Sequence, residues 1–407
     1  MTVESPIERD CVIAGGGPAG MVLGYLLARR GLRVTVLEKH GDFLRDFRGD
    51  TVHPSTVTLL GELGLRERFL ELPLTRLSTL DAVVDGQRIT IVDFATLPRP
   101  DNFLVFAPQW DFLNFLAREA SAFPTFELRM LTEATGLIIE EGRVCGVRTG
   151  TSDGGLEIRA TLTVAADGRA SVLRAAAGMD PEDFGVPIDV LWFNLPKPPD
   201  PPPPTLGYIS AQGMVLTIDR GDRYQSGMVI PKGGFDDLRA AGIGALQTRI
   251  TAAAPFLHPV VSTLVDWDQI RILSVQINRL RRWYRPGFIA IGDAAHAMSP
   301  MFGVGVNFAI QDAVALSNAI AEDLATGAVA TEKLAGVQRR RETPVRIMQR
   351  LQRNGHKALA RATAGRRIAP RWLVVLLRAA SPLLRPVTAR FVGIGVRPEH
   401  VNGGIKG

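Results

Sequence analysis

Three glycines near the N-terminus have the spacing of a loop that binds the phosphates of a dinucleotide. Gly15, Gly17 and Gly20 form the pattern G-x-G-x-x-G directly after the apolar run of residues 11–14. In such a loop the first glycine permits a tight turn, the second lets the backbone approach a pyrophosphate, and the third lets helix and strand pack closely. The N–H groups at the start of the next helix attract phosphate.

The elements needed to position this loop surround it in the sequence. Residues 11–14 predict a buried strand, residues 19–30 a helix that Pro18 and Ala19 open, and residues 33–37 a second strand. Glu38 and Lys39 follow that strand, and Glu38 can accept hydrogen bonds from ribose hydroxyls. The complete β-α-β unit predicts dinucleotide binding. The alternative is a glycine-rich turn in another α/β protein, and the unit does not separate FAD from NAD.

A second motif, "AADGRASVLR", follows a predicted strand and opens a helix. It holds Asp167, Gly168, Ser171 and Arg174 with the spacing D-G-x-x-S-x-x-R. By itself this motif is also typical of a helix start capped by an aspartate.

A third motif spans residues 288–316, where an apolar strand ends at Gly292 and Asp293. Asp293 is placed to bind a ribityl or ribose hydroxyl, and a glycine-containing loop then precedes a helix from about Val306. The alternative is an ordinary β-loop-α crossover with Asp312 solvated on its helix. The candidate residues of the loop are Pro300, Gly303, Gly305, Val306 and Asn307.

The order of these three motifs resembles that of the single-component FAD-dependent monooxygenases of the para-hydroxybenzoate hydroxylase type. The resemblance covers residues 10 to about 330 and includes "RGDTVHPSTVTLLGELGL", residues 48–65. It implies an α/β fold with a Rossmann-like FAD-binding domain, a mixed or antiparallel sheet that binds substrate, and a helical C-terminal region. One departure is Val304, where many relatives have glutamine.

The resemblance also implies roles for individual residues. Gly15, Gly17, Gly20 and Glu38 would hold the adenosine half of FAD, and Arg48 and Gln109 would lie near its phosphates and ribityl chain. Asp167, with Gly168, would serve both FAD and NADPH. Gly292 and Asp293 would bind the ribityl chain, and the loop from Pro300 to Asn307 would lie beside the flavin ring, with Pro300 also a catalytic candidate.

The chemistry implied is oxygen insertion. Transiently bound NAD(P)H would reduce tightly bound FAD, and O2 would form a flavin C4a-hydroperoxide that hydroxylates or epoxidises an aromatic, polyketide-like or quinone-like molecule. The chain has no second G-x-G-x-x-G unit, which agrees with transient binding of the nicotinamide cosubstrate. The alternatives are a flavin dehydrogenase, oxidase or reductase on the same fold, and a non-catalytic FAD-binding redox sensor.

Candidate substrate contacts come from the predicted strands after residue 186. The alternative for each is a place in the core of the sheet or on its solvent-facing side. His53 is expected near FAD, and His296 is expected to pack under the flavin loop and not to act as a base. The candidates are Trp192, Tyr208, Met214, Met228 and Tyr224, of which Tyr224 would orient or deprotonate a phenol.

The two predicted domains alternate along the chain. The FAD domain is expected at residues 1–78, 108–178 and 279–335, and the substrate domain at residues 79–107 and 179–278. Residues 336–407 form a basic helical region, and the proline run of residues 196–204 predicts an exposed connection.

Composition excludes several classes of protein. The chain has 407 residues, 46% of them hydrophobic, and only two cysteines, so neither a disulfide framework nor a zinc site is expected. The polar, acidic start lacks the pattern of a signal peptide, and no run reaches the length of a membrane span. We therefore predict a cytoplasmic enzyme without a metal.

Charge is distributed unevenly. Residues 338–397 hold fifteen Lys or Arg and one acid, Glu342, whereas residues 1–337 hold 31 basic and 39 acidic side chains. Three interpretations of the basic segment stay open: a helical cover over the FAD domain, peripheral contact with an anionic membrane, or an oligomer surface in a monomer-or-homodimer protein. Nucleic-acid binding is not expected, because the chain has no nucleic-acid-binding module.

Overall fold

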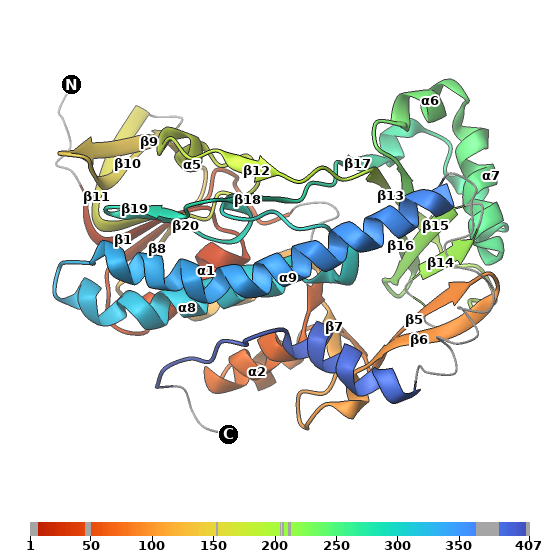
Figure 1. Ribbon diagram of the computed structural model, residues 1–407, viewed down its shortest axis with the longest axis horizontal. Helices are drawn as coiled ribbons and strands as arrows, with labels where there is room; N and C mark the ends of the chain where they lie inside the picture. The colour runs from red at the N-terminus through yellow and green to blue at the C-terminus, as the bar shows by residue number, and fades with distance from the viewer. Residues whose placement is uncertain are drawn as a thin grey trace.

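Two large sheets form the two halves of the molecule (Figure 1). The computed structural model describes residues 7–44, 50–151, 154–203, 205, 207–210, 213–363 and 382–403. An eight-stranded sheet carries the nucleotide-binding motifs, and a seven-stranded sheet lies at the other end of the long axis. The predicted α/β fold class is confirmed.

Parallel pairing in the eight-stranded sheet brings the three motifs together. Its path is β19-β20-β11-β1-β2-β8, and β10 and β9 extend it from β11. Ala14, Ala165 and Ala290 are in register at the carboxyl ends of neighbouring parallel strands. The strands are β1 (Ile7–Ala14), β2 (Val34–Leu37), β8 (Phe126–Arg129), β9 (Glu133–Glu140), β10 (Arg143–Thr151), β11 (Gly154–Ala165), β19 (Tyr284–Arg285) and β20 (Phe288–Ala290).

Three helices cover this sheet. α1 (Pro18–Ala28) packs against α8 (Gly305–Ala325) and α4 (Gln109–Ala120), and their apolar side chains form the largest core cluster. Among the described residues, the stretch Met301–Ala325 is long and apolar enough to cross a membrane. It is 83% buried inside the protein, as expected for a core helix.

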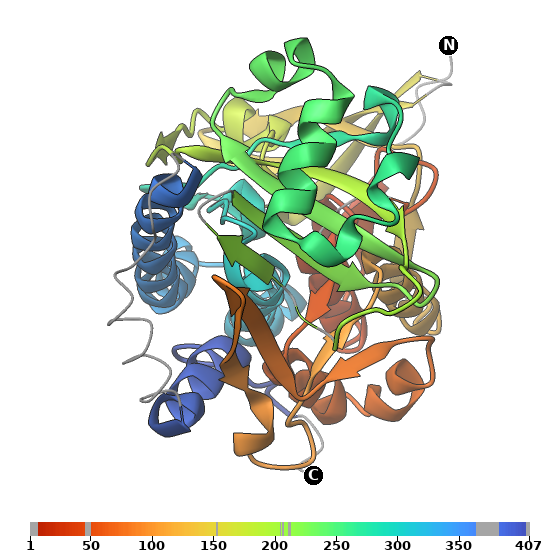
Figure 2. The same ribbon diagram turned by 90° about the vertical axis from the view of Figure 1, so that its right-hand side faces the viewer.

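The seven-stranded sheet is mostly antiparallel and has helices on one face. α6 (Phe235–Ala240) and α7 (Ile243–Ala253), drawn in green, lie over that face in Figure 2. The order of strands is β17-β13-β16-β15-β14-β5-β6. Their bounds are β5 (Thr79–Val84), β6 (Gln87–Asp93), β13 (Ile188–Pro196), β14 (Gly207–Ser210), β15 (Gly213–Asp219), β16 (Arg223–Pro231) and β17 (Arg271–Leu273).

Smaller elements join the two halves. β3 (Thr51–Val52), β7 (Leu104–Phe106) and β4 (Thr75–Leu77) form a three-stranded sheet, and β12 (Pro181–Asp183) pairs with β18 (Asn278–Leu280). Two helices follow β3, α2 (Pro54–Glu62) and α3 (Arg66–Leu70), and Gly64 with φ +74° separates them. Gly242, with φ +88°, likewise separates α6 from α7.

The C-terminal region is helical where it is described. α9 (Thr331–Thr363) runs along the molecule from the first sheet to the second (Figure 1). A helix at residues 382–389 continues into the π-helical turn Arg390–Ile394, which packs on α2. The basic residues within 364–381, with the apolar run 372–377, lie outside the described residues.

Candidate active site

The glycine loop has the close backbone approaches that its spacing predicts. Gly15 has φ +107°, and a Cβ there would lie 2.3 Å from the carbonyl oxygen of Ala166. A Cβ on Gly20 would lie 1.9 Å from the carbonyl oxygen of Gly15. Gly17 differs, since a Cβ there would meet no atom within 4 Å. Gly15 and Gly20 therefore shape the loop, while Gly17 at the start of α1 faces open space that a phosphate can enter.

Glu38, the acid at the end of β2, makes hydrogen bonds to the backbone of the glycine loop and of the turn that follows β2. The carboxylate of Glu38 accepts hydrogen bonds from the backbone N–H of Gly16, 3.2 Å, and of His40, 3.0 Å. Lys39 is more than half exposed and stands 3.9 Å from Glu133. Glu38 therefore lies next to the glycine loop, as predicted, whereas Lys39 points to an acid on β9.

The Asp-Gly motif begins α5 (Val172–Ala176) and ties it to the third motif. Asp167 Oδ2 accepts from the N–H of Leu173, 3.2 Å, while its buried Oδ1 has no hydrogen-bond partner among the described residues. Burial raises the pKa of Asp167, although hydrogen bonds from Ser171 and the backbone oppose the rise. Arg174 donates to the carbonyl oxygens of Ala294, 3.1 Å, and Arg169, 2.9 Å.

Asp293 lies beside both other motifs. Its Oδ2 accepts from Arg169 Nε at 3.0 Å, and both side chains are about one-third exposed. Gly292 before it has φ +58°, and a Cβ there would lie 3.3 Å from that of Ala19 on α1. Asp293 therefore lies next to the start of α1. A ribityl hydroxyl can reach its partly exposed carboxylate if it replaces part of the contact with Arg169.

The predicted flavin loop is held by residues 51–53. Gly303, with φ +63°, follows Pro300 by three residues, and its carbonyl oxygen accepts from Thr51 Oγ1 at 2.7 Å. His53 Nε2 lies 3.0 Å from the same oxygen, and its Nδ1 lies 2.9 Å from the carbonyl oxygen of Val392. Burial lowers the pKa of His53. His53 thus links the flavin loop to the C-terminal segment.

The remaining predicted FAD contacts have different environments. Asn307 is buried, and its Oδ1 accepts from Ser55, 2.9 Å, and Thr56, 2.8 Å, so it joins α8 to α2. Val306 lies partly buried in the first turn of α8, and Gly305 begins that helix. Gln109 starts α4 and donates its N–H to Asp50 Oδ1, 3.3 Å. Arg48 lies outside the described residues.

A buried charged network lies directly behind Gly292. Asp312 accepts from the N–H of Gly292, 3.1 Å, from His296 Nε2, 2.6 Å, and from Arg341 Nε, 3.0 Å. Burial acts to raise the pKa of Asp312, but His296 and Arg341 outweigh it and lower that pKa below its ordinary value. Asp312 is fully buried and not solvated. Part of the basic segment therefore faces inward, where Arg341 also reaches Glu399 at 3.4 Å.

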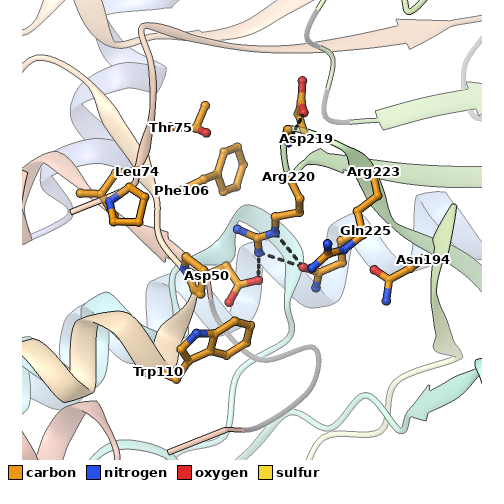
Figure 3. A pocket seen from close by; sticks show the side chains of 13 residues that line it. Asp50, Leu74, Thr75, Phe106, Trp110, Asn194, Asp219, Arg220, Arg223 and Gln225 are labelled. Atoms are coloured by element: carbon orange, nitrogen blue, oxygen red, sulfur yellow. Dashed lines mark hydrogen bonds and ion pairs between the residues drawn. The ribbon is translucent and has the colours of Figure 1, made fainter. Parts of the chain in front are cut away.

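A cavity of about 470 Å³ lies between the two halves (Figure 3). Asp50 precedes Thr51, which contacts Gly303, so the cavity adjoins that loop. One wall comes from the FAD half and the other from β13, β16 and the β15–β16 turn. The lining residues are Asp50, Pro73, Leu74, Thr75, Phe106, Pro108, Trp110, Asn194, Asp219, Arg220, Gly221, Arg223 and Gln225.

None of the five predicted substrate contacts lines this cavity. Successive side chains of a strand point to opposite faces, and Tyr224, Tyr208 and Met228 lie on the face under α7. Tyr224 packs edge-on to Phe256, with ring centroids 5.9 Å apart, and burial raises its pKa. The side chain of Tyr224 therefore points away from this cavity, and its role as a base stays a prediction.

Trp192 and Met214 lie on the other face of the sheet, toward the FAD half. The residues that prediction missed are Gln225, the next residue after Tyr224, and Asn194, its partner across the β13–β16 pair. Because side chains alternate between the two faces of a strand, the sequence already indicates that Tyr224 and Gln225 point to opposite faces of the sheet. Asp50 was in the quoted stretch of residues 48–65, but nothing local indicated its partner Arg220, 170 residues away.

Comparison with known proteins shows the family of the chain. Residues 8–350 match the family described as FAD binding domain. The 6-methylpretetramide 4-monooxygenase of Streptomyces rimosus is 33% identical over 350 residues, 84% of this chain and 83% of that protein. A digeranylgeranylglycerophospholipid reductase of Methanocella arvoryzae is 26% identical over 343 residues, 81% of each chain. The solved structure of OxyS anhydrotetracycline hydroxylase from Streptomyces rimosus is similar with a TM-score of 0.76 and 22% identity, covering 96% of this chain and 77% of that one.

The chain therefore belongs to the FAD-binding domain family. The match confirms the predicted resemblance, the Rossmann-like fold, the FAD cofactor and the class of FAD-dependent monooxygenase. The local geometry fits FAD, because the two glycines that a Cβ would block enclose an open helix start at Gly17.

Proposed function

We propose that the protein is an FAD-dependent monooxygenase that takes NAD(P)H transiently and inserts one atom of O2 into an aromatic or polyketide-like molecule. The single observation that carries the proposal is the register of Ala14, Ala165 and Ala290. It supports one dinucleotide site built from all three motifs, with the cavity of about 470 Å³ beside its flavin loop.

The chain's own residues would bind and orient both molecules. Gly15, Gly17 and Gly20 would hold the pyrophosphate against the start of α1, and Glu38 the ribose. Asp293 would hold the ribityl chain, and the backbone of Gly303 and Gly305 would lie along the ring. When bound, FAD supplies the redox chemistry by accepting a hydride from NAD(P)H and activating dioxygen.

The cavity walls support a ring-shaped substrate. Trp110, Phe106 and Leu74 supply apolar surface, while Asn194, Arg220 and Gln225 supply hydrogen-bonding groups from the opposite wall (Figure 3). Apolar surface that packs against a ring, together with polar groups that fix its orientation, is typical of small-molecule sites. Closure of the two walls on a substrate would exclude bulk water from the reacting centre.

The test is isotopic. FAD-loaded protein is mixed with NADH or NADPH, 6-methylpretetramide or simpler phenols, and ¹⁸O-labelled dioxygen, and the product is analysed by mass spectrometry. One labelled oxygen atom per product, with substrate-stimulated NAD(P)H oxidation, is expected. A product without label would contradict the proposal and favour a dehydrogenase, oxidase or reductase.

A reductase is the second candidate, because the archaeal reductase matches 81% of this chain. It would consume reducing equivalents and leave the product free of labelled oxygen. A redox sensor would show neither product nor stimulation of NAD(P)H oxidation by any member of the panel. The same experiment therefore separates the three functions.

A further inference from the structure

One side of α9 carries buried polar side chains along most of its length. Their positions fall on the same side of a helix that has about 3.6 residues per turn. A buried amide or guanidinium costs free energy unless it is hydrogen-bonded, so each of these groups should have a partner within the protein. The five residues are Gln338, Arg341, Gln349, Gln352 and His356.

Gln352 uses its side-chain amide entirely on the backbone beside the predicted flavin loop. Its Oε1 accepts from the N–H of Ser299, 3.2 Å, and its Nε2 donates to the carbonyl oxygens of Ser299, 3.0 Å, and Met301, 3.0 Å. An amide side chain has two N–H donors and one carbonyl acceptor, so both donors and the acceptor are engaged by a stretch of three residues. Gln352 therefore fixes the peptide groups on both sides of Pro300.

The backbone at Phe302 shows why this loop needs support. Phe302 has φ +69°, in the left-handed region that residues other than glycine rarely occupy. Backbone of this kind persists only where the surrounding structure holds it. Gln352 holds the carbonyl group of Met301 just before Phe302, and residues 51–53 hold that of Gly303 just after it. The strained residue is therefore fixed from both directions along the chain.

A second side chain of α9 contacts the same loop. His356 Nε2 lies 2.7 Å from Ser299 Oγ, which accepts from the N–H of Met301 at 3.1 Å. Burial lowers the pKa of His356 to about 4, so its imidazole is neutral at neutral pH. A Cβ on Gly355 would lie 2.8 Å from Sδ of Met301, so this turn of α9 packs closely on the loop.

Resting on the function proposed above, in which the loop from Pro300 to Gly305 lies beside the flavin ring, we propose that Gln352 is a positioning residue for that ring. It acts through the loop and not by contact with FAD. Its amide holds the peptide groups of residues 299–301 in the shape that receives the ring, and His356 assists by holding Ser299. The basic C-terminal region is thereby coupled to the ring half of the cofactor site.

This role predicts an effect that is confined to one half of FAD. The hydrogen bonds of Gln352 go to residues 299–301, whereas the adenosine half would be held by the glycine loop and Glu38. Loss of the amide should therefore loosen the ring. ADP, which has the adenosine and the pyrophosphate but no ring, should bind as before.

The test compares these two ligands. The FAD-free full-length chain is titrated with ADP and with FAD, and the visible circular dichroism of bound FAD is recorded as a signature of the surroundings of the ring. Gln352→Met, which keeps the size of the side chain and removes its hydrogen bonds, is expected to bind ADP as wild type does. It is expected to bind FAD about tenfold more weakly and to change the dichroism, because a displaced loop loses contacts to the ring.

Gln349→Met is the matched control. Gln349 is also a buried amide of α9, and it donates to the carbonyl oxygens of Asn278, 2.8 Å, and Ala297, 3.0 Å, and accepts from Arg279 at 2.7 Å. Both variants lose two donated and one accepted hydrogen bond, so both should lower the melting temperature of the FAD-free chain to a similar extent. Only Gln352→Met should change the FAD affinity and the dichroism, since the partners of Gln349 lie outside the loop.

Ser299→Ala is a milder change that tests the same coupling if Gln352→Met does not fold. It removes the hydroxyl that lies between His356 and the N–H of Met301. The expected result is a loss of FAD affinity of about threefold, with ADP binding unchanged, because one side-chain contact of the loop is lost while those of Gln352 remain.

Clear results would overturn the inference. Equal weakening of ADP and FAD in Gln352→Met, or the same loss of FAD affinity in Gln349→Met, would show general damage to the fold. Unchanged FAD affinity and dichroism in Gln352→Met, or in Ser299→Ala, would exclude control of the ring by α9. Since these measurements need neither NAD(P)H nor O2, a selective loss of FAD without labelled product would count against the monooxygenase alone, and labelled product without that selective loss against this inference alone.

Discussion

A Cβ on Gly20 would lie 1.9 Å from the carbonyl oxygen of Gly15, whereas one on Gly17 would meet no atom within 4 Å. The three glycines of one motif therefore have different reasons to be glycine. At position 20 a side chain would clash with the protein's own backbone. At position 17 a side chain would clash only with a ligand that comes close to the loop.

The first prediction uses this difference. Gly20→Ala is expected to distort the loop and to yield protein with little bound FAD and a lower melting temperature. Gly17→Ala should fold normally, with its melting temperature unchanged in the absence of FAD, and bind FAD more weakly. Absorbance of bound flavin and thermal unfolding, with and without added FAD, measure both effects. An unfolding defect in Gly17→Ala equal to that of Gly20→Ala would contradict this assignment.

The second prediction concerns the buried network behind Gly292. Asp312→Asn leaves His296 and Arg341 without their carboxylate and is expected to lower the free energy of unfolding by roughly 3–5 kcal/mol. Asp323→Asn, on the same helix but paired with Lys333 near the surface, should change it by less than about 1 kcal/mol. Urea denaturation measures both.

The pH dependence of that difference has a defined sign. The pKa of Asp312 is lowered in the folded state, so its stabilisation is present above the unfolded pKa. It is lost as pH falls through the folded pKa. The gap between wild type and Asp312→Asn should therefore narrow in acid, and a gap that widens there would contradict the proposed ion pairs.

The third prediction tests which face of β16 binds substrate. Gln225→Ala removes a cavity-lining side chain that also holds Arg220, and is expected to raise KM by about tenfold or more. Tyr224→Phe, one residue earlier and on the face under α7, should leave kcat and KM close to wild type. Steady-state kinetics with the substrate that incorporates labelled oxygen is the measurement. A large loss of kcat in Tyr224→Phe would instead support the predicted role of Tyr224 as a base.

The fourth prediction follows from the raised pKa of Asp50. The folded protein holds this proton more tightly than the unfolded chain, so ionisation costs stability as pH rises from 3.8 to about 6. Asp50→Asn cannot ionise, and relative to wild type it should gain up to about 3 kcal/mol across that interval. Chemical denaturation at a series of pH values measures this. A difference that does not change with pH would show that Asp50 has an ordinary pKa.

The local sequence determined the parts of the site that depend on neighbouring residues. The glycine loop, Glu38, the capped start of α5 and the Gly292–Asp293 turn each follow from a few adjacent residues, and all lie where their strands predict. Their convergence was also predictable, since parallel strands present their carboxyl ends at one edge of a sheet.

The tertiary structure alone decided which side chains face the cavity. Tyr224 and Gln225 are neighbours on one strand, and the pairing of that strand with β13 and the packing of α7 choose which of the two points inward. Asp50 meets Arg220 across 170 residues, and Arg341 of the basic segment is buried against Asp312. These contacts depend on how whole helices and strands pack together, and local residue patterns do not indicate which distant residues will meet.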